Sequence, residues 1–303
     1  MTGSSPIKGR PGARTVVITD SGLGGLLICA GLERRLGPGR EPVRLVYVNA
    51  WPDARSGYND LPDMPARAAV LDRTLTAMTA FFPDLILIAC NTLSVVYEAT
   101  AFSKKPAVPV KGILDAGADL FHEALAGDPD AVLALFGTRT TIGSGEYIRR
   151  LARRGTAERR VVSEPCHGLA AVIDKDPDSP EIPGLVDACV GRIAPRLPAG
   201  APLYAGLACT HYAYIAETFR MALCRRTGGE VRILEPGERL IEGLTRDAPG
   251  RMPESPERTV DVEVVSKVEL TEGQRRAVAR RLEPLSPTTA RALLEYRRRP
   301  DLF

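Results

Sequence analysis

Two cysteines, Cys90 and Cys209, each follow a short apolar segment that ends in alanine. The first segment reads Asp84-Leu-Ile-Leu-Ile-Ala, and the second reads Leu203-Tyr-Ala-Gly-Leu-Ala. Apolar residues with helical spacing follow both cysteines, so each thiol is expected at a helix N-terminus, where the helix dipole and backbone N–H groups favour the thiolate. Two equivalent acid–base groups suit a symmetric reaction such as racemisation, in which one removes an α-proton and the other returns it on the opposite face. The alternative is that both are small buried side chains, where free cysteines usually lie.

Asp20 and His211 are the side chains best placed to assist these thiols. His211 lies two residues after Cys209, and Asp20 begins the turn Asp20-Ser-Gly-Leu-Gly-Gly25. Glycines let the backbone of such a turn approach a ligand closely, and the helix start that follows can receive an anion. The turn lacks the G-x-G-x-x-G spacing and the acidic ribose partner of a dinucleotide site. A plain structural turn is the alternative.

The sequence predicts neither a metal site nor a cofactor. Cys90, Cys209 and His211 lack a fourth ligand and the spacing of a zinc finger. Without a secretion signal, the cysteines are expected to be reduced thiols. Four of them are interpreted as structural or surface residues: Cys29, Cys166, Cys189 and Cys224.

Short apolar runs that alternate with helix-like segments predict an α/β fold with parallel strands buried on both faces. The expected strands are Thr15–Thr19, Arg44–Val48, Leu85–Ala89, Val108–Ile113, Val132–Phe136, Arg160–Ser163, Leu203–Ala208 and Val231–Leu234. Near the end of the chain, Thr259–Leu270 alternates like a half-exposed strand, and Gln274–Leu282 and Thr288–Arg297 are predicted as closing helices.

An internal repeat indicates two similar halves. The separation of Cys90 from Cys209 is nearly that of Ser21 from Thr138, and both pairs follow predicted strands. Two matched landmarks at matched spacing favour two similar α/β units related by a pseudo-twofold axis. Because ligands of parallel sheets bind beyond the carboxyl ends of the strands, the site is expected in the cleft between the units.

Composition and charge exclude several classes of protein. Hydrophobic residues make up 44% and charged residues 25% of the 303-residue chain, as in ordinary globular proteins. The net charge of +3, without a basic tract, argues against nucleic acid or an anionic membrane as a partner. No apolar run is long enough for a membrane span. Residues 1–14 are predicted as a disordered leader without the features of a signal peptide, and the expected location is cytoplasmic.

The motifs together resemble those of the glutamate racemases, in family order. The matching segments are Asp20–Gly25, Ala89-Cys-Asn-Thr92, Gly137–Tyr147 and Cys209-Thr-His-Tyr212. The stretch Cys166–Asp176 resembles the segment in which the family carries an acidic residue, and Asp174 takes that place. The likeness covers about Thr15 to Leu244.

The resemblance implies cofactor-independent racemisation of an amino acid through Cys90 and Cys209, with help from Asp20 and His211. It implies a first domain of residues 15–111 plus 213–303 and a second domain of residues 112–212. It also implies a set of substrate-binding residues: Ser21, Tyr58, Asn91, Thr92, Thr138, Thr141, Asp174 and Thr210.

Two segments depart from the family pattern. In the loop of residues 49–62, Asn49 takes the place of an aspartate, and Gly57-Tyr58 is only a shifted match. Glu235-Pro-Gly237 replaces the usual Asp-Ser. Because this loop handles the far end of the substrate in the family, reaction type is better supported than substrate identity.

Several alternatives stay open at this point. Glutamate is the expected substrate, but a racemase or decarboxylase of the same superfamily with another substrate, or a non-catalytic ligand-binding homologue, fits parts of the pattern. Two retained cysteines favour racemisation, since some superfamily members keep only one. The oligomeric state is open, with a homodimer among the alternatives, as is a role in peptidoglycan biosynthesis against a specialised pathway.

Overall fold

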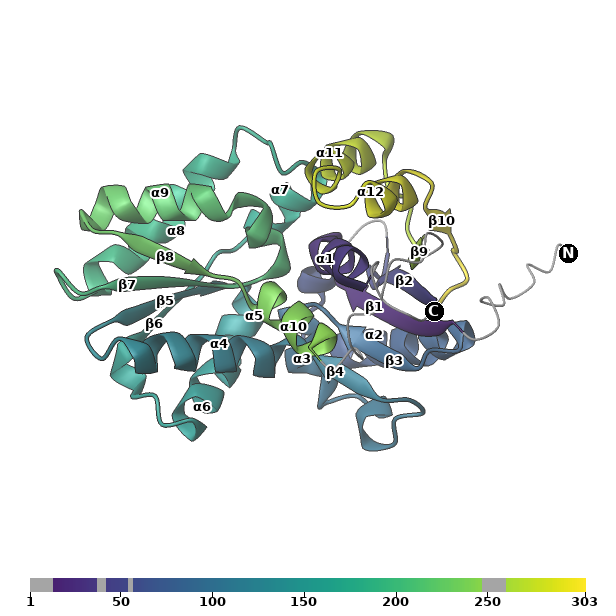
Figure 1. The fold of residues 1–303 in the computed structure, drawn as a ribbon, viewed down its shortest axis with the longest axis horizontal. Coiled ribbons are helices and arrows are strands. Elements are labelled where there is room, and N and C mark those ends of the chain that lie inside the picture. Colours follow the sequence, from purple (N-terminus) through teal and green to yellow (C-terminus); the bar gives the residue numbers. More distant parts are fainter. Residues whose placement is uncertain (1–12, 37–41, 54–56, 247–259) are drawn as a thin grey trace, which may run out of the picture.

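Two parallel β-sheets form the framework of the chain in the computed structural model (Figure 1). The structure describes residues 13–36, 42–53, 57–246 and 260–303. The first sheet has the strand order β10-β9-β2-β1-β3-β4 and the second has the order β6-β5-β7-β8. All their pairings are parallel, which confirms the predicted fold class.

The strands of the first sheet are β1 (Arg14–Asp20), β2 (Val43–Asn49), β3 (Leu85–Ile88), β4 (Val110–Gly112), β9 (Val260–Ser266) and β10 (Arg297–Arg298). Those of the second are β5 (Val132–Gly137), β6 (Val161–Pro165), β7 (Leu203–Ala208) and β8 (Val231–Leu234). Strands β2, β3, β5 and β7 are buried along their whole length. Helices on both faces account for this burial, which is why these strands appear in the sequence as continuous apolar runs.

The α-helices are α1 (Leu26–Leu36), α2 (Met64–Met78), α3 (Asn91–Tyr97), α4 (Ile113–Gly127), α5 (Arg139–Gly143), α6 (Glu146–Arg153), α7 (Leu169–Lys175), α8 (Ile182–Ile193), α9 (Ala216–Thr227), α10 (Pro236–Thr245), α11 (Glu272–Leu282) and α12 (Pro287–Leu294). Side-chain caps fix several helix starts. Thr138 accepts a hydrogen bond from the backbone N–H of Thr141, and Thr271 accepts one from that of Gln274. In Figure 1, α8 and α9 lie on one side of the second sheet, and α4 and α6 lie on the other.

The two sheets repeat one topology. The order β2-β1-β3-β4 in the first sheet corresponds strand for strand to β6-β5-β7-β8 in the second. Cys90 follows β3 and Cys209 follows β7, so the two cysteines occupy equivalent places in the repeat. The internal repeat predicted from the sequence is therefore present as repeated strand order.

The carboxyl ends of the two sheets face each other near the middle of the molecule (Figure 1). A buried hydrogen bond from Thr210, just after β7, to Asp20, at the end of β1, joins them. Helix α10 packs on both α1 and α4, and α11 packs on α7. The C-terminal segment thus reaches the second sheet as well as the first.

Some predicted boundaries differ from the structure. The prediction assigned residues 213–303 to the first unit, but β8 pairs with β7, and α9 packs on α8. The second sheet needs β8 as the counterpart of β4, so the chain returns to the first sheet only after α10. The short strand β10 was not predicted, and it follows the end of α12, where a helix was expected to continue.

Most of the predicted leader lies outside the described residues. The structure does not describe residues 1–12 of this leader. It also does not describe Thr259, the first residue of the strand predicted near the end of the chain. Arg14, which the prediction placed in the leader, instead begins β1 and pairs with Val43.

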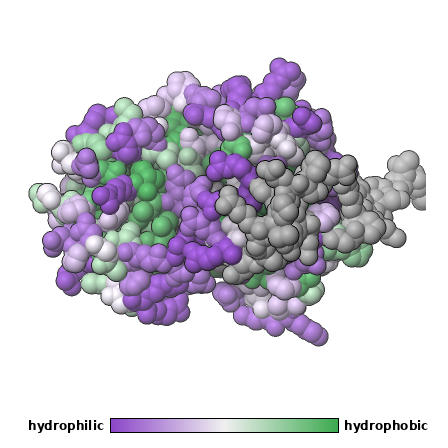
Figure 2. Space-filling view, viewed as in Figure 1, coloured by the Kyte–Doolittle hydropathy of each residue, from purple (hydrophilic) through white to green (hydrophobic). Residues whose placement is uncertain are grey.

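Polar residues cover most of the face seen in Figure 2. Hydrophobic side chains gather on the left of this view, over the second sheet. Strand β8 is an edge strand there, with Ile233 and Leu234 half-buried.

Candidate active site

Cys90 lies between β3 and α3 and caps the helix. Its sulfur accepts a hydrogen bond from the backbone N–H of Leu93 at 3.5 Å and lies 3.3 Å from the Ser21 hydroxyl. These contacts favour the thiolate, as the sequence predicted. Burial and the charge of Asp20 nevertheless raise the pKa of Cys90 above the value of a free thiol. Burial thus outweighs the effect of the helix N-terminus on the pKa of this thiol.

Cys209 follows β7 and has a different setting. A 3₁₀-helix, Thr210–Ile215, comes next, and α9 begins only at Ala216, so the prediction of an α-helix directly after this cysteine is wrong. The Cys209 sulfur receives no capping hydrogen bond from the backbone. It lies instead 3.8 Å from Nδ1 of His211.

A chain of hydrogen bonds leads away from Cys209 through His211. Nε2 of His211 lies 2.7 Å from Oδ1 of Asp174, and both side chains are buried. Burial opposes a positive charge on His211, but the hydrogen bonds to Asp174 and Cys209 outweigh it and raise the pKa of His211 well above its usual value. An imidazolium in contact with the Cys209 sulfur can stabilise a thiolate or return a proton to it.

Asp174 is held by three hydrogen bonds from the protein. Oδ1 accepts from the backbone N–H of Leu23 at 2.7 Å as well as facing His211, and Oδ2 accepts from Nε2 of Gln274 at 2.8 Å. The sequence suggested a contact between Asp174 and substrate. Both oxygens are engaged by protein groups, and Oδ1 orients the His211 ring through Nε2.

Asp20 is fully buried at the end of β1. Oδ2 accepts a hydrogen bond from the Thr210 hydroxyl at 2.8 Å, and Oδ1 accepts one from the backbone N–H of Gly22 at 3.2 Å. Burial raises the pKa of Asp20, and the charge of His211 opposes that rise. The negative charge of Asp20 also raises the pKa of Cys90. This carboxyl group therefore acts on Cys90 and on His211, the neighbour of Cys209.

Three threonine hydroxyls form a buried cluster that joins the two sheets. Oγ1 of Thr92, next to Cys90 in α3, lies 2.8 Å from that of Thr138 and 3.1 Å from that of Thr141. Thr138 and Thr141 follow β5, and their hydroxyls are 3.0 Å apart. Each hydroxyl can donate or accept, so the cluster can turn its protons towards an anion.

The side-chain amide of Asn91 is only partly engaged by the described part of the chain. Its Oδ1 accepts a hydrogen bond from the Tyr147 hydroxyl at 2.5 Å, which fixes the orientation of the amide. Its Nδ2 is buried and has no hydrogen-bond partner among the residues that the structure describes. A buried unpaired donor costs free energy, so this N–H group is suited to an acceptor on a bound ligand.

The glycines of the Asp20–Gly25 turn serve the protein's own packing. A Cβ atom on Gly22 would lie 2.5 Å from Oδ1 of Asp174, and one on Gly24 would lie 2.5 Å from Oγ1 of Thr210. The turn therefore needs these glycines in order to approach the site residues.

The loop of residues 49–62 is only partly described. Tyr58 is buried, and its hydroxyl donates to the carbonyl of Arg67 at 2.8 Å. Burial and the charge of a Cys90 thiolate raise the pKa of Tyr58. Nδ2 of Asn49 donates to the Ser266 hydroxyl. Arg55 of the same loop, whose guanidinium group could pair with a carboxylate, lies outside the described residues.

A small cavity of about 40 Å³ lies beside Cys209. Asn91, Thr210 and Glu235 are among the residues that line it. Burial and the neighbouring charge of Glu238 raise the pKa of Glu235 to about 7. Glu235 stands where the sequence departs from the family pattern, so a titratable carboxyl group borders the site there.

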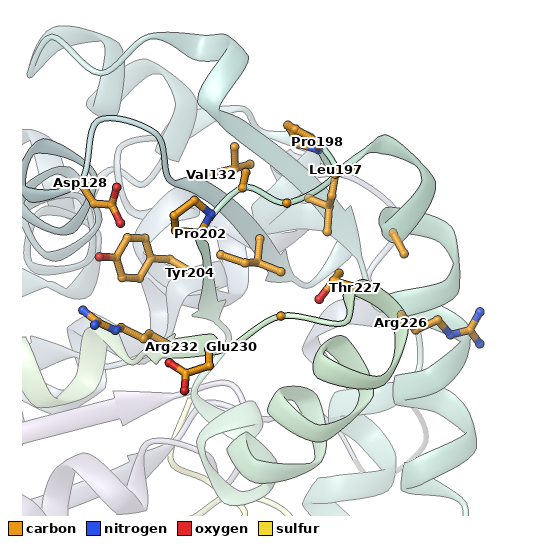
Figure 3. Close-up of a pocket in the computed structure, with 16 residues that line it drawn as sticks. Asp128, Val132, Leu197, Pro198, Pro202, Tyr204, Arg226, Thr227, Glu230 and Arg232 are labelled. Atoms are coloured by element: carbon orange, nitrogen blue, oxygen red, sulfur yellow. The ribbon is translucent and has the colours of Figure 1, made fainter.

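A second cavity, of about 410 Å³, lies at the opposite end of the second sheet (Figure 3). Val132 and Leu203 line it, and they begin β5 and β7. Both cysteines of the candidate site follow the carboxyl ends of their strands. This cavity is therefore separate from the chemistry considered above.

Three residues at the site were not predicted to have a role: Tyr147, Glu235 and Gln274. Tyr147 closes the third motif, so its position was visible although its bond to Asn91 was not. Gln274 comes from α11, far from Asp174 in sequence, and no local pattern identifies such a contact.

Within the described residues, no group of His, Cys, Asp and Glu side chains is arranged to hold a metal ion. None of the helices in the described ranges combines the length and apolar character that a membrane crossing needs.

Comparisons with known proteins all match this chain to racemases. Residues 26–244 match the family model described as Asp/Glu/Hydantoin racemase. A glutamate racemase of Cereibacter sphaeroides is 31% identical over 79% of this chain and 86% of its own length. One of Cupriavidus pinatubonensis is 30% identical over 78% of this chain and 83% of its own.

Solved structures share the fold at lower identity. Glutamate racemase from Francisella tularensis, in complex with D-glutamate, has a TM-score of 0.68 at 19% identity and covers 89% of this chain and 94% of its own. That from Campylobacter jejuni has a TM-score of 0.66 at 20% identity, with coverage of 94% and 100%.

The fold and the matched residues define an isomerase that racemises its substrate. The chain belongs to the Asp/Glu/Hydantoin racemase family.

Proposed function

We propose that this protein interconverts L- and D-glutamate without a cofactor, with Cys90 and Cys209 as the two acid–base groups. The observation that carries the proposal is the equivalence of the two thiols. Each follows the third strand of a repeated four-strand unit, and the carboxyl ends of the two units meet. A symmetric pair of acid–base groups fits a reaction whose forward and reverse directions are mirror images.

In the proposed reaction one cysteine thiolate removes the α-proton, and the thiol of the other donates a proton to the opposite face. The roles exchange in the reverse direction. Ser21 assists Cys90, whose sulfur its hydroxyl contacts, and His211 assists Cys209. Asp174 holds His211 in place, and Gln274 in turn holds Asp174.

Substrate binding supplies a reason for a thiolate to form. Burial raises the pKa of Cys90. The ammonium group of an amino acid brings a positive charge into the site, and a nearby opposite charge lowers the pKa of a thiol. Asp20 is positioned to hold that ammonium group or to exchange a proton with Cys90.

The polar groups of the site match the main chain of an amino acid. Nδ2 of Asn91 and the hydroxyls of Thr92, Thr138 and Thr141 are donors for the α-carboxylate. The Ser21 and Thr210 hydroxyls complete the binding set. A carboxylate that accepts several such hydrogen bonds is compensated for its burial.

Glutamate is proposed as the substrate because relatives of about 30% identity are named glutamate racemases. The loop of residues 49–62, which includes Tyr58, would handle the distal carboxylate. The role that follows from this activity is to supply D-glutamate for peptidoglycan biosynthesis in the cytoplasm.

The test is incubation of enantiopure L- or D-glutamate with the purified protein in D₂O. Circular dichroism follows loss of optical activity, and mass spectrometry counts deuterium in the product. We expect complete racemisation with one deuterium at the α-carbon, unaffected by dialysis against a chelator. Racemisation of aspartate or glutamine in preference to glutamate would contradict the substrate assignment, and absence of exchange with any amino acid would contradict the enzyme function.

A further inference from the structure

Strand β8 forms one edge of the second sheet. It pairs with β7 through Val231–Leu234, and the strand order gives it no neighbour on its other side. In Figure 1 it lies next to α9, and in the same view hydrophobic side chains gather over this sheet (Figure 2). Ile233 and Leu234 are only half-buried. The β8 edge therefore offers a row of backbone donors and acceptors beside apolar side chains.

The other sheet edges are protected in ways that the β8 edge is not. At the β6 edge, Arg196 donates to the carbonyl of Ser163, and Arg192 donates to that of Pro165 at 3.5 Å. In the first sheet, the edge strands β4 and β10 have only three and two residues. Strand β8 is longer, and no side chain in the described part of the chain makes a hydrogen bond to its backbone. Blocked backbone groups and short strands are common protection against pairing with another chain.

Two opposite charges lie on the same face of the β8 edge. Glu230 directly precedes β8, and Arg232 is its second residue, so their side chains project to the same side of the strand. Both are exposed, and neither makes an ion pair with another residue of the described ranges. Both also border the cavity at the amino end of the sheet (Figure 3). Val231, between them, projects to the other face and is buried.

The order of these two charges is self-complementary. When β8 pairs antiparallel with its own copy, centred on Val231, Glu230 of each chain lies opposite the partner's Arg232. Side chains directly opposite each other have Cβ atoms about 4.5–5.5 Å apart, and opposite charges there are stabilising. The twofold axis generates two such pairs. A second copy of this chain is therefore the partner that fits the β8 edge.

This pairing keeps the two active sites apart. Val231 begins β8, whereas the candidate site lies at the carboxyl ends of the strands. In an antiparallel pair the carboxyl ends of the two copies point in opposite directions. The first sheets of the two chains then lie at opposite ends of the dimer, and each site is built from one chain.

We propose that the protein forms a homodimer through the β8 edge, with the two strands antiparallel and centred on Val231. The two second sheets join into one continuous sheet, in the order β6-β5-β7-β8-β8-β7-β5-β6. The same surface of both copies forms the interface, as in most soluble dimers. The half-buried Ile233 and Leu234 add apolar surface, and Glu230 and Arg232 fix the register. The proposal does not depend on the racemase function, because its readout is the oligomeric state.

Size-exclusion chromatography with light scattering measures the mass of the full-length protein over a range of concentrations. We expect a species with twice the 32.6 kDa mass of one chain. Arg232→Glu places like charges opposite each other in both pairs and should raise the Kd of the dimer at least about tenfold. Glu230→Arg should do the same. Arg291→Glu is the matched control, because Arg291 is exposed on α12, which packs on β9 of the first sheet.

A mixture of the two variants tests the register. When Arg232→Glu pairs with Glu230→Arg, every glutamate again lies opposite an arginine, so dimers should reappear on mixing. Native mass spectrometry separates this heterodimer from either homodimer, and circular dichroism checks that both variants are folded. A wild-type protein that is monomeric at every concentration, or Arg232→Glu with the Kd of the wild type, would overturn the proposal. Failure of the two folded variants to associate when mixed would overturn the pairing centred on Val231.

Discussion

Asp174→Asn is the substitution that most directly probes the hydrogen-bond chain behind Cys209. Asparagine has the shape of aspartate and keeps one oxygen, which can still accept from Leu23 and His211. The negative charge is lost, and the His211 pKa falls with it, because the hydrogen bond to Asp174 is the largest cause of its elevation. A hydrogen bond to a charged group contributes about 1.5–3 kcal/mol. Since about 1.4 kcal/mol corresponds to a tenfold change in rate, kcat/KM should fall roughly 10- to 150-fold.

The assay is circular dichroism of glutamate racemisation, started from each enantiomer in turn. Enantiomers have equal free energies, so the equilibrium constant is one and kcat/KM must fall by the same factor in both directions. Asp178→Asn is the matched control, because Asp178 is more exposed and pairs with Arg281 on the surface. Wild-type kcat/KM in Asp174→Asn, with normal stability, would refute the role given to His211.

Four further predictions concern binding, positioning, pH and stability. Asn91→Ala should raise the KM for glutamate by about 10- to 100-fold through loss of a hydrogen bond to a carboxylate, and an unchanged KM would remove Asn91 from the binding set. Gln274→Met should lower kcat less than tenfold and shift its pH profile, since the side-chain amide of Gln274 donates to Asp174; a larger effect on KM than on kcat would speak against a positioning role. Because burial raises the pKa of Cys90, the thiolate fraction grows with pH, and kcat/KM should rise from pH 6 to 8; a flat profile in this range would contradict a thiolate base. Glu263→Gln weakens the partly buried pair with Arg44, at 2.9 Å, and should cost about 1.5–3 kcal/mol in urea unfolding, whereas a loss below 1 kcal/mol would show that the pair is not stabilising.

The strands of the fold were largely predictable because buried parallel strands leave continuous apolar runs in the sequence. The strand β10 escaped prediction because two exposed arginines carry no such pattern. The sheet to which β8 belongs was also missed, since an apolar run does not identify its partner strand. The repeat contained the missing information: β8 is the counterpart of β4.

At the site, the sequence identified which residues come together better than it identified the contacts between them. Cys90, Asp20 and Thr210 lie together, as expected from strand ends that meet. The state of Cys90 could not be predicted, because burial depends on packing by distant segments. The contact of Gln274 with Asp174 spans two elements far apart in the chain, and it arises only when α11 packs on α7.

Proton exchange in single-cysteine variants tests the central claim most directly. Cys90→Ser and Cys209→Ser are each incubated with L- and D-glutamate in D₂O, with Cys29→Ser as a buried-cysteine control outside the site. We expect both site variants to lose racemisation by at least about 10²-fold. Each should still exchange the α-proton of one enantiomer, and the two variants should exchange opposite enantiomers. Near-wild-type racemisation by either variant, or exchange of the same enantiomer by both, would contradict a mechanism with two thiols on opposite faces of the substrate.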